Sequence, residues 1–181
     1  YMPMTVHQKN YEFNTGELIK DVKTDYEYDT WGNTTKTIVK DGSIETTTTN
    51  TFINNTDKWL LGRLTESTVS KSNENSTITR KSSFEYDQNS GLLTTEVFAP
   101  GNTELGYRKT YVHDNFGNIV KSTVSSLDGS SERITQTHYD TKGRYIVSSI
   151  NSLGFLETLK YNEVEGLVTA STDKNGIVTN Y

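Results

Sequence analysis

Short runs rich in Thr, Val, Ile and other β-formers recur along this chain, and polar residues stand between their apolar positions. Residues 34–39, 119–124 and 132–137 are such runs. None of them places apolar residues at i, i+3, i+4 and i+7, the spacing of an amphipathic helix. Because β-branched residues fit a pleated, half-exposed surface, the pattern predicts an all-β protein.

Glycine-containing turns separate these runs, and most begin with an aromatic residue followed by Asp or Asn. The copies are Tyr28-Asp29 with Gly32, Tyr86-Asp87 with Gly91, His113-Asp114 with Gly117, Tyr139-Asp140 with Gly143, and Tyr161-Asn162 with Gly166. From 86 to 113 is 27 residues, from 113 to 139 is 26, and from 139 to 161 is 22. Such a period is typical of a repeat array, in which each unit is stabilised mainly by its neighbours.

Two further copies are weaker. Phe13-Asn14-Thr15-Gly16 resembles the unit at the start of the chain, and residues 52–62, from Phe52 to Gly62, fill the gap between positions 28 and 86. Within this second copy, residues 53–62 combine a capping residue, an apolar cluster and a terminal Gly, which predicts a single helical turn. We expect the cluster of Trp59, Leu60 and Leu61 to be buried.

A second set of turns falls between these units. Its members are Asp41-Gly42, Pro100-Gly101-Asn102, Asp128-Gly129, Leu153-Gly154 and Asn175-Gly176. An Asp at the first turn position accepts hydrogen bonds from later backbone amides, and Gly adopts the left-handed conformation. The sequence therefore predicts tandem antiparallel β-hairpins that form one continuous curved sheet over residues 1–181.

Composition narrows the class of protein. Hydrophobic residues make up 31% and mean hydropathy is −0.68, but 11 Tyr and only 2 Pro argue against disorder. A net charge of −5 excludes the basic footprint of a nucleic-acid-binding protein. There is no Cys, no apolar run long enough to span a bilayer, and no signal peptide at Tyr1-Met2-Pro3-Met4. We interpret the chain as a piece of a longer protein.

Candidate catalytic groups have simpler structural explanations. His113 replaces a repeat Tyr, His138 lies beside Tyr139, and the recurring Asp residues are the ones that the turns require. No nucleotide-binding glycine loop or EF-hand spacing is present. We expect no catalytic residues, cofactor or metal, and hence no enzyme. Glycan binding by exposed Tyr and Trp, as in a cell-surface adhesion module, is kept as the alternative.

The repeated motifs resemble the RHS/YD-repeat proteins. Tyr139-Asp140-Thr141-Lys142-Gly143-Arg144 is similar to the YDxxGR unit of that family, and Thr172-Asp173-Lys174-Asn175-Gly176 to its TDxxG unit. Residues 47–65 resemble SpvB-like proteins and the B components of insecticidal Tc toxins. The resemblance implies a secreted or cell-surface bacterial protein in which such sheets form a hollow shell around a toxic C-terminal polypeptide. Its partners would be the rest of the shell and the enclosed toxin. Self-cleavage in that family belongs to a region with a DPxG-type sequence, and no Asp-Pro occurs here.

Overall fold

The computed structural model describes residues 2–181; Tyr1, where the predicted array begins, lies outside the described residues. The described chain contains only β-strands and turns. The strands are β1 (Thr5–Tyr11), β2 (Leu18–Tyr28), β3 (Thr34–Asp41), β4 (Ile44–Asn55), β5 (Leu60–Ser72), β6 (Thr77–Tyr86), β7 (Leu93–Phe98), β8 (Tyr107–His113), β9 (Ile119–Ser126), β10 (Glu132–Tyr139), β11 (Ile146–Ile150), β12 (Leu156–Tyr161), β13 (Val168–Thr172) and β14 (Val178–Asn180). The all-β prediction is confirmed.

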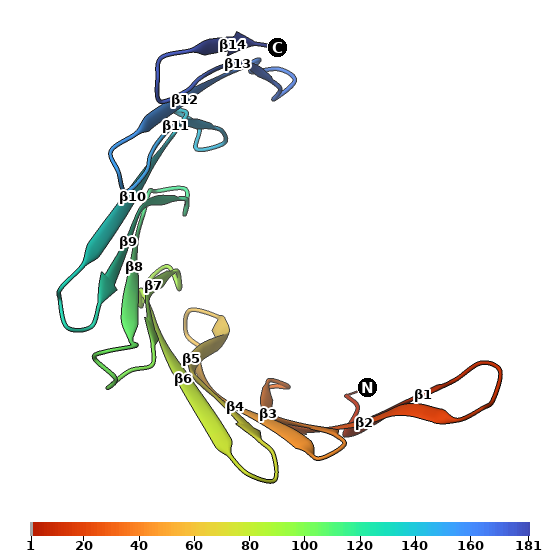
Figure 1. The fold of residues 1–181 in the computed structure, drawn as a ribbon. Coiled ribbons are helices and arrows are strands. Elements are labelled where there is room, and N and C mark those ends of the chain that lie inside the picture. The colour runs from red at the N-terminus through yellow and green to blue at the C-terminus, as the bar shows by residue number, and fades with distance from the viewer. Residues whose placement is uncertain (1) are drawn as a thin grey trace. The chain divides into compact units, whose positions relative to one another are not determined.

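All fourteen strands belong to one sheet, and their order in the sheet is their order in the chain (Figure 1). Every strand pair whose register is resolved is antiparallel, as tandem hairpins require. The chain divides into two compact units. The first comprises the residues up to Gly91 with Val97–Pro100, and the second Leu92–Glu96 with Gly101–Tyr181.

The two faces of the sheet differ in the first unit. Tyr26, Thr37, Thr48, Val69 and Arg80 are directly paired across β2 to β6, so they form one row on one face. The opposite face carries five lysine ion pairs between neighbouring strands or along one strand, whereas the Tyr26 face carries Lys20–Asp41 at 3.1 Å. The five pairs of the opposite face are Lys9–Asp21 at 3.6 Å, Lys23–Asp25 at 2.9 Å, Lys36–Glu27 at 3.2 Å, Lys40–Glu45 at 3.3 Å and Lys81–Glu66 at 2.7 Å. Acidic and basic side chains balance there, so this face is charged but nearly neutral.

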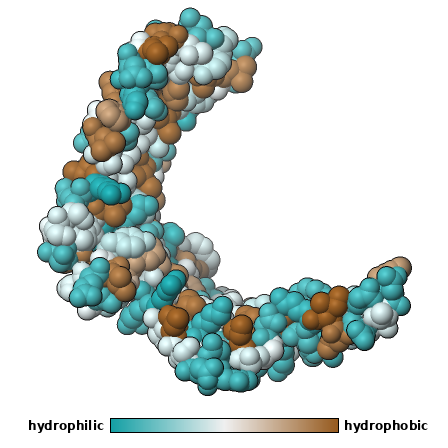
Figure 2. Space-filling model, in the orientation of Figure 1, coloured by the Kyte–Doolittle hydropathy of each residue, from teal (hydrophilic) through white to brown (hydrophobic). Residues whose placement is uncertain are grey.

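The sheet has almost no buried core. Among residues 2–181 only two hydrophobic side chains are buried, those of Val97 and Ala170. Figure 2 shows hydrophobic residues dispersed among hydrophilic ones over the visible surface. With so little burial, the free energy of folding depends on contacts between adjacent hairpins, as in other quasi-one-dimensional arrays.

The predicted helical turn at residues 53–62 is wrong. β4 and β5 remain paired out to Asn55 and Leu60, which leaves only a four-residue turn, 56–59, between them. The Asn55 side chain accepts a hydrogen bond from the Lys58 amide at 3.0 Å, so capping chemistry closes a hairpin instead of starting a helix.

The expected burial of Trp59 is wrong too, because its side chain is 76% exposed at the tip of this hairpin. Its backbone has a φ of 55°, in the left-handed region that non-glycine residues seldom adopt. Leu60 and Leu61, which begin β5, are half-buried.

Candidate functional site: stacked turns at one end of the strands

The predicted motif residues come together at one end of the strands. In an antiparallel sheet whose strands follow chain order, successive turns alternate between the two ends. The turns after β2, β4, β6, β8, β10 and β12 therefore share one end, which we name the Tyr-Asp end. All five motif copies that begin with Tyr or His and the Phe52–Gly62 copy lie there. The turns after β1, β3, β5, β7, β9, β11 and β13 lie at the opposite end.

Each Asp of the motif organises its own turn. The Asp29 carboxylate accepts hydrogen bonds from the amides of Trp31 at 2.8 Å and Asn33 at 2.9 Å. The Gly32 amide donates to the Asp29 carbonyl at 3.1 Å, and Gly32 has a φ of 84°. This combination closes a reversal that most side chains could not adopt.

The same arrangement recurs in the other copies. Asp114 accepts from the amides of Phe116 and Asn118 at 2.8 and 2.9 Å. Asp87 and Asn162 head the turns with one extra residue, closed by the amides of Gly91 and Gly166 at 2.9 and 2.8 Å. Asp140 accepts from the Tyr145 amide at 3.1 Å and from the Arg144 amide.

These hydrogen bonds keep the turn carboxylates ionised. The Asn33 side chain and then backbone amides lower the pKa of Asp29, and the Ser90 amide is the main cause of the lowered pKa of Asp87. Partial desolvation raises the pKa of Asp114 and Asp140, but hydrogen bonds from Asn118 and Arg144 outweigh it, so both pKa values are lowered. Ionised, fully engaged carboxylates are suited to holding turns and poorly suited to donating protons.

The aromatic residues that precede the turns are held by the sheet. Tyr28 donates its hydroxyl to the Pro3 carbonyl and Tyr86 to the Leu64 carbonyl, both at 2.9 Å. The Tyr28 ring stacks on Tyr26 with centroids 6.2 Å apart. His113 contacts Tyr111 with ring centroids 6.4 Å apart, which places this histidine in the same ring-packing position as the repeat tyrosines.

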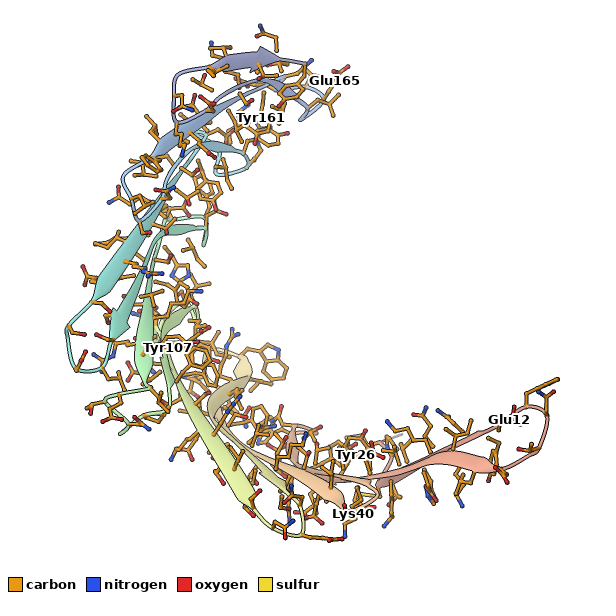
Figure 3. The ribbon with its side chains drawn as sticks, in the orientation of Figure 1. Glu12, Tyr26, Lys40, Tyr107, Tyr161 and Glu165 are labelled. Atoms are coloured by element: carbon orange, nitrogen blue, oxygen red, sulfur yellow. The ribbon has the colours of Figure 1, made fainter. Side chains whose placement is uncertain are left out.

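A β-bulge marks the aromatic position in every Tyr-Asp copy with a resolved strand register. The pairing shifts immediately before Tyr28, Phe52, His113, Tyr139 and Tyr161. In each case the extra residue lies on the following strand, opposite the aromatic residue, so it is that strand which bends; these residues are Thr35, Thr65, Val120, Val147 and Thr169. In Figure 3, Tyr161 is labelled close to the turn between β12 and β13.

Glycine has a second role at the Tyr-Asp end, where each turn glycine lies against the chain that precedes its hairpin. A β-carbon on Gly62 would lie 2.9 Å from Asn33 Oδ1, one on Gly91 2.7 Å from Leu60, and one on Gly166 2.8 Å from the Tyr145 hydroxyl. The same applies to Gly143, whose Cβ position is occupied by the Phe116 ring, and more loosely to Gly32 and Gly117. The turns at this end therefore stack directly on one another.

Six turn glycines at the opposite end lack such a neighbour. A β-carbon on Gly16, Gly42, Gly101, Gly129, Gly154 or Gly176 would meet no atom within 4 Å. These glycines also have positive φ, so there glycine satisfies only the turn conformation. The two sets of turns look alike in sequence and differ in packing.

Sequence reasoning placed one copy incorrectly and missed another. At the start of the chain Tyr11 and Glu12, not Phe13 and Asn14, take the aromatic and acidic positions, and the Gly16 amide donates to the Glu12 carbonyl at 2.9 Å. This turn lies at the opposite end, with Glu12 at the tip of the β1–β2 hairpin (Figure 3). Asn102 heads an equivalent turn closed by the Gly106 amide at 2.8 Å. In the sequence, both turns could have been recognised by a residue with a side-chain hydrogen-bond acceptor, Glu12 or Asn102, four residues before a glycine.

Two pockets lie between successive turns at the Tyr-Asp end, one in each unit. The first, of about 360 Å³, is lined by residues that include Leu60, Arg63, Phe84, Tyr86 and Gly91. The second, of about 380 Å³, is lined among others by Asp140, Tyr145, Leu159 and Tyr161. In the second pocket the rings of Tyr145 and Tyr161 stack with centroids 4.8 Å apart. No group of three or more potential metal ligands occurs within residues 2–181.

The fold and its stacked turns define an antiparallel repeat sheet of the type that the RHS/YD resemblance implied, and solved structures share it. The crystal structure of TcdB2-TccC3 without its hypervariable C-terminal region matches with a TM-score of 0.61 over 92% of this chain, at 14% sequence identity. The TcdB2-TccC3-Cdc42 crystal structure matches with a TM-score of 0.52 over 99% of the chain, at 10% identity. A Tc holotoxin pore of Photorhabdus luminescens gives 0.51 over 97%, at 14% identity.

The likeness is one of fold, and it is partial. The chain covers 9% of the first of these structures, 12% of the second and 10% of the third. No protein-family model and no curated protein sequence matches the chain. The predicted resemblance to the repeat sheets of Tc toxin components is thereby confirmed at the level of fold. The described residues contain no helix capable of crossing a lipid bilayer.

Proposed function

We propose that this chain is a non-catalytic wall segment of a larger bacterial RHS/YD-repeat toxin protein, secreted or held at the cell surface. The wall would enclose a toxic polypeptide and would consist of this segment and its neighbouring repeats. The observation that carries the proposal is the close packing of four turn glycines, Gly62, Gly91, Gly143 and Gly166, on the preceding turn at the Tyr-Asp end, in a sheet shared with a TcdB2-TccC3 structure over 92% of the chain.

The thinness of the sheet supports a role as part of a larger wall. A single layer with two buried hydrophobic side chains among its described residues has little stability of its own, so further repeats would add the burial that it lacks. The outer edges of β1 and β14 have no strand partner within residues 2–181, and a continuing sheet would pair them.

The chemistry of the site supports a non-catalytic role. The turn aspartates are engaged by their own backbone amides, and two of the tyrosine hydroxyls by backbone carbonyls. Glycan binding through an aromatic platform is less favoured, because Tyr26 and Tyr28 stack on each other, as do Tyr145 and Tyr161.

A protease-protection assay on the parent protein tests the proposal. We expect deletion of residues 1–181 to expose the enclosed polypeptide to added protease, whereas the intact parent protects it. If the deletion variant does not fold, Gly143→Val in the full parent provides a second test. The added side chain should loosen the stacking of the turns and so speed cleavage of the enclosed polypeptide by the protease. Equal protection in the intact and altered proteins would refute the wall role.

The non-catalytic part of the proposal has a separate test. His113→Phe and His138→Thr in the parent should leave any self-processing and any release of the enclosed polypeptide at the unaltered rate. Loss of processing in either variant, with the fold retained by circular dichroism, would show that a histidine takes part in chemistry.

A further inference from the structure

Two arginines occupy equivalent places after turn glycines but have different partners. Arg144 follows Gly143, and its Nε and Nη2 atoms donate to Asp140 Oδ2 at 3.3 and 3.1 Å. Arg63 follows Gly62, yet its Nε is buried and has no hydrogen-bond partner among the described residues. A buried charged donor without an acceptor is costly, and native structures seldom retain one without a reason.

The residue that follows the aromatic position differs between the two copies. Asp140 follows Tyr139 and supplies a carboxylate to Arg144, whereas Ile53 follows Phe52 and supplies none. Asn54, the next residue, accepts a hydrogen bond from the Gly62 amide at 2.7 Å with its Oδ1. Arg63 therefore lacks the carboxylate within its own turn that Arg144 has.

Arg63, with its unpartnered Nε, lines the pocket of about 360 Å³ in the first unit. Its Cζ lies 5.8 Å from the centroid of the Tyr86 ring, and Ile53, Leu60 and Phe84 form apolar walls. Gly91 makes this arrangement possible, because a β-carbon there would lie 2.9 Å from Arg63 Nη2. The pocket thus combines a cationic donor with apolar surface.

We propose that this pocket, the Arg63 pocket, binds one carboxylate, supplied by an Asp or Glu side chain of a polypeptide segment with an adjoining apolar residue. The planar guanidinium of Arg63 matches a carboxylate in geometry, and the bound anion would satisfy the buried Nε. Ile53, Leu60 and Phe84 would accept the adjoining apolar side chain.

The lining of the pocket argues for this ligand over other anions. Glu85 and Asp87 also line it, and hydrogen bonds from Ser90 keep the pKa of Asp87 low, so the pocket repels a doubly charged phosphate more strongly than a single carboxylate. Ile53, Leu60 and Phe84 form its apolar walls, which suit an apolar body beside the charge. A single charge on an apolar body fits both features.

The carboxylate-binding proposal is argued from Arg63, its turn and the pocket, and it does not depend on the wall proposal. In a toxin shell, the natural source of the carboxylate would be the enclosed polypeptide. Failure of the wall role would leave the binding of an acidic peptide by this chain unaffected, so the two proposals are tested separately.

Titration of the isotopically labelled chain by NMR tests the site, with the capped dipeptide acetyl-Leu-Glu-amide as the probe. We expect saturable shifts at the Arg63 side chain and the Gly91 amide, and binding at least roughly tenfold weaker for acetyl-Leu-Gln-amide, which lacks the charge. Inorganic phosphate and glucuronate are the competing probes. Equal binding of the two dipeptides, no saturable binding, or tighter binding of phosphate or glucuronate would overturn the proposal.

Three variants assign the binding to Arg63. Arg63→Gln should weaken dipeptide binding by about tenfold or more, because the charge-assisted hydrogen bonds are lost. Asn54→Asp should weaken it too, because it places a negative charge at the Gly62 amide, next to Arg63 in the chain, and it keeps the test valid if Arg63→Gln does not fold. Arg144→Gln, the matched control, should bind as the unaltered chain does. Unchanged binding by Asn54→Asp with a retained Arg63 resonance position would contradict the proposed role of this arginine.

Discussion

The ring of Phe116 occupies the space where a β-carbon of Gly143 would lie, so a side chain of one Tyr-Asp turn is seated on the glycine of the next. Gly154, at the opposite end of the strands, has a similar left-handed backbone, with a φ of 79° against 66°, but open space around it. Both positions require glycine for its left-handed backbone conformation, but only Gly143 also requires it for close packing.

We predict that Gly143→Ala destabilises the chain more than Gly154→Ala does. Both variants carry the strain of a side chain at positive φ, but only the first adds a collision with Phe116. The additional loss in free energy of unfolding should be about 1–3 kcal/mol, the usual cost of overpacking. Urea unfolding followed by circular dichroism measures both, and equal losses would mean that the turns do not stack as described.

A double-mutant cycle isolates the contact. Phe116→Ala in the Gly143→Ala background should recover part of the lost stability, since the alanine methyl group then has room. The coupling free energy should be about 0.5–3 kcal/mol, as for residues in contact. Additive effects of the two substitutions would contradict a direct contact.

Asn118 links two successive turns through its side-chain amide. Its Nδ2 donates to Asp114 Oδ2 at 3.1 Å and to the Gly143 carbonyl at 2.8 Å. The Asn33 amide donates to Asp29 Oδ2 at 2.8 Å within its own turn. We predict that Asn118→Ala costs about 1 kcal/mol more in unfolding free energy than Asn33→Ala, the contribution of one hydrogen bond. Matched urea midpoints for the two variants would argue against a linking role.

The stability of the sheet should fall in acid. The pKa values of Asp29, Asp87, Asp114, Asp128 and Asp140 are lowered in the folded chain. The unfolded chain therefore binds more protons in this range, so stability is complete above about pH 4–5 and is lost as pH falls through the folded pKa values.

Among these groups, Asp128 should lose its contribution to stability at the lowest pH, because hydrogen bonds from the Ser126 side chain and the Ser130 amide lower its pKa to about 2. Thermal unfolding midpoints measured from pH 6 down to pH 2 check the prediction. Asp128→Asn, which keeps an acceptor but cannot titrate, should flatten the lower part of the curve. A midpoint that is constant or rises toward acid would contradict the sign.

Trp59 carries backbone strain without compensating burial. Its φ is 55° and its side chain is 76% exposed. We predict that Trp59→Asn raises the free energy of unfolding by about 0.5–1 kcal/mol, because asparagine tolerates the left-handed region better. Trp31, half-exposed in its turn and without a positive φ, serves as the control, and Trp31→Asn should give no gain. A loss at position 59 would indicate that the indole ring makes a stabilising contact.

Much of the fold follows from local chemistry that a sequence displays directly. An Asp or Asn followed by glycine three or four residues later folds its own reversal, because acceptor and amides are close along the chain. β-branched runs between such turns have few alternatives to strands. The all-β class and the turns at Gly32, Gly117 and Gly143 were therefore predictable from residues within a few positions of one another.

The packing between hairpins depends on residues far apart in the chain, and only the tertiary structure decided it. Nothing in the motifs distinguishes Gly143, covered by Phe116, from Gly154 in open space. The extension of β4 and β5 overrode the capping signals at residues 53–62 and left Trp59 exposed, since strand pairing supplied the hydrogen bonds that a helix would have used. Likewise, Arg63 and Arg144 follow glycine alike, and only the tertiary structure shows that Arg144 pairs with Asp140 while the Nε of Arg63 is buried without a hydrogen-bond partner.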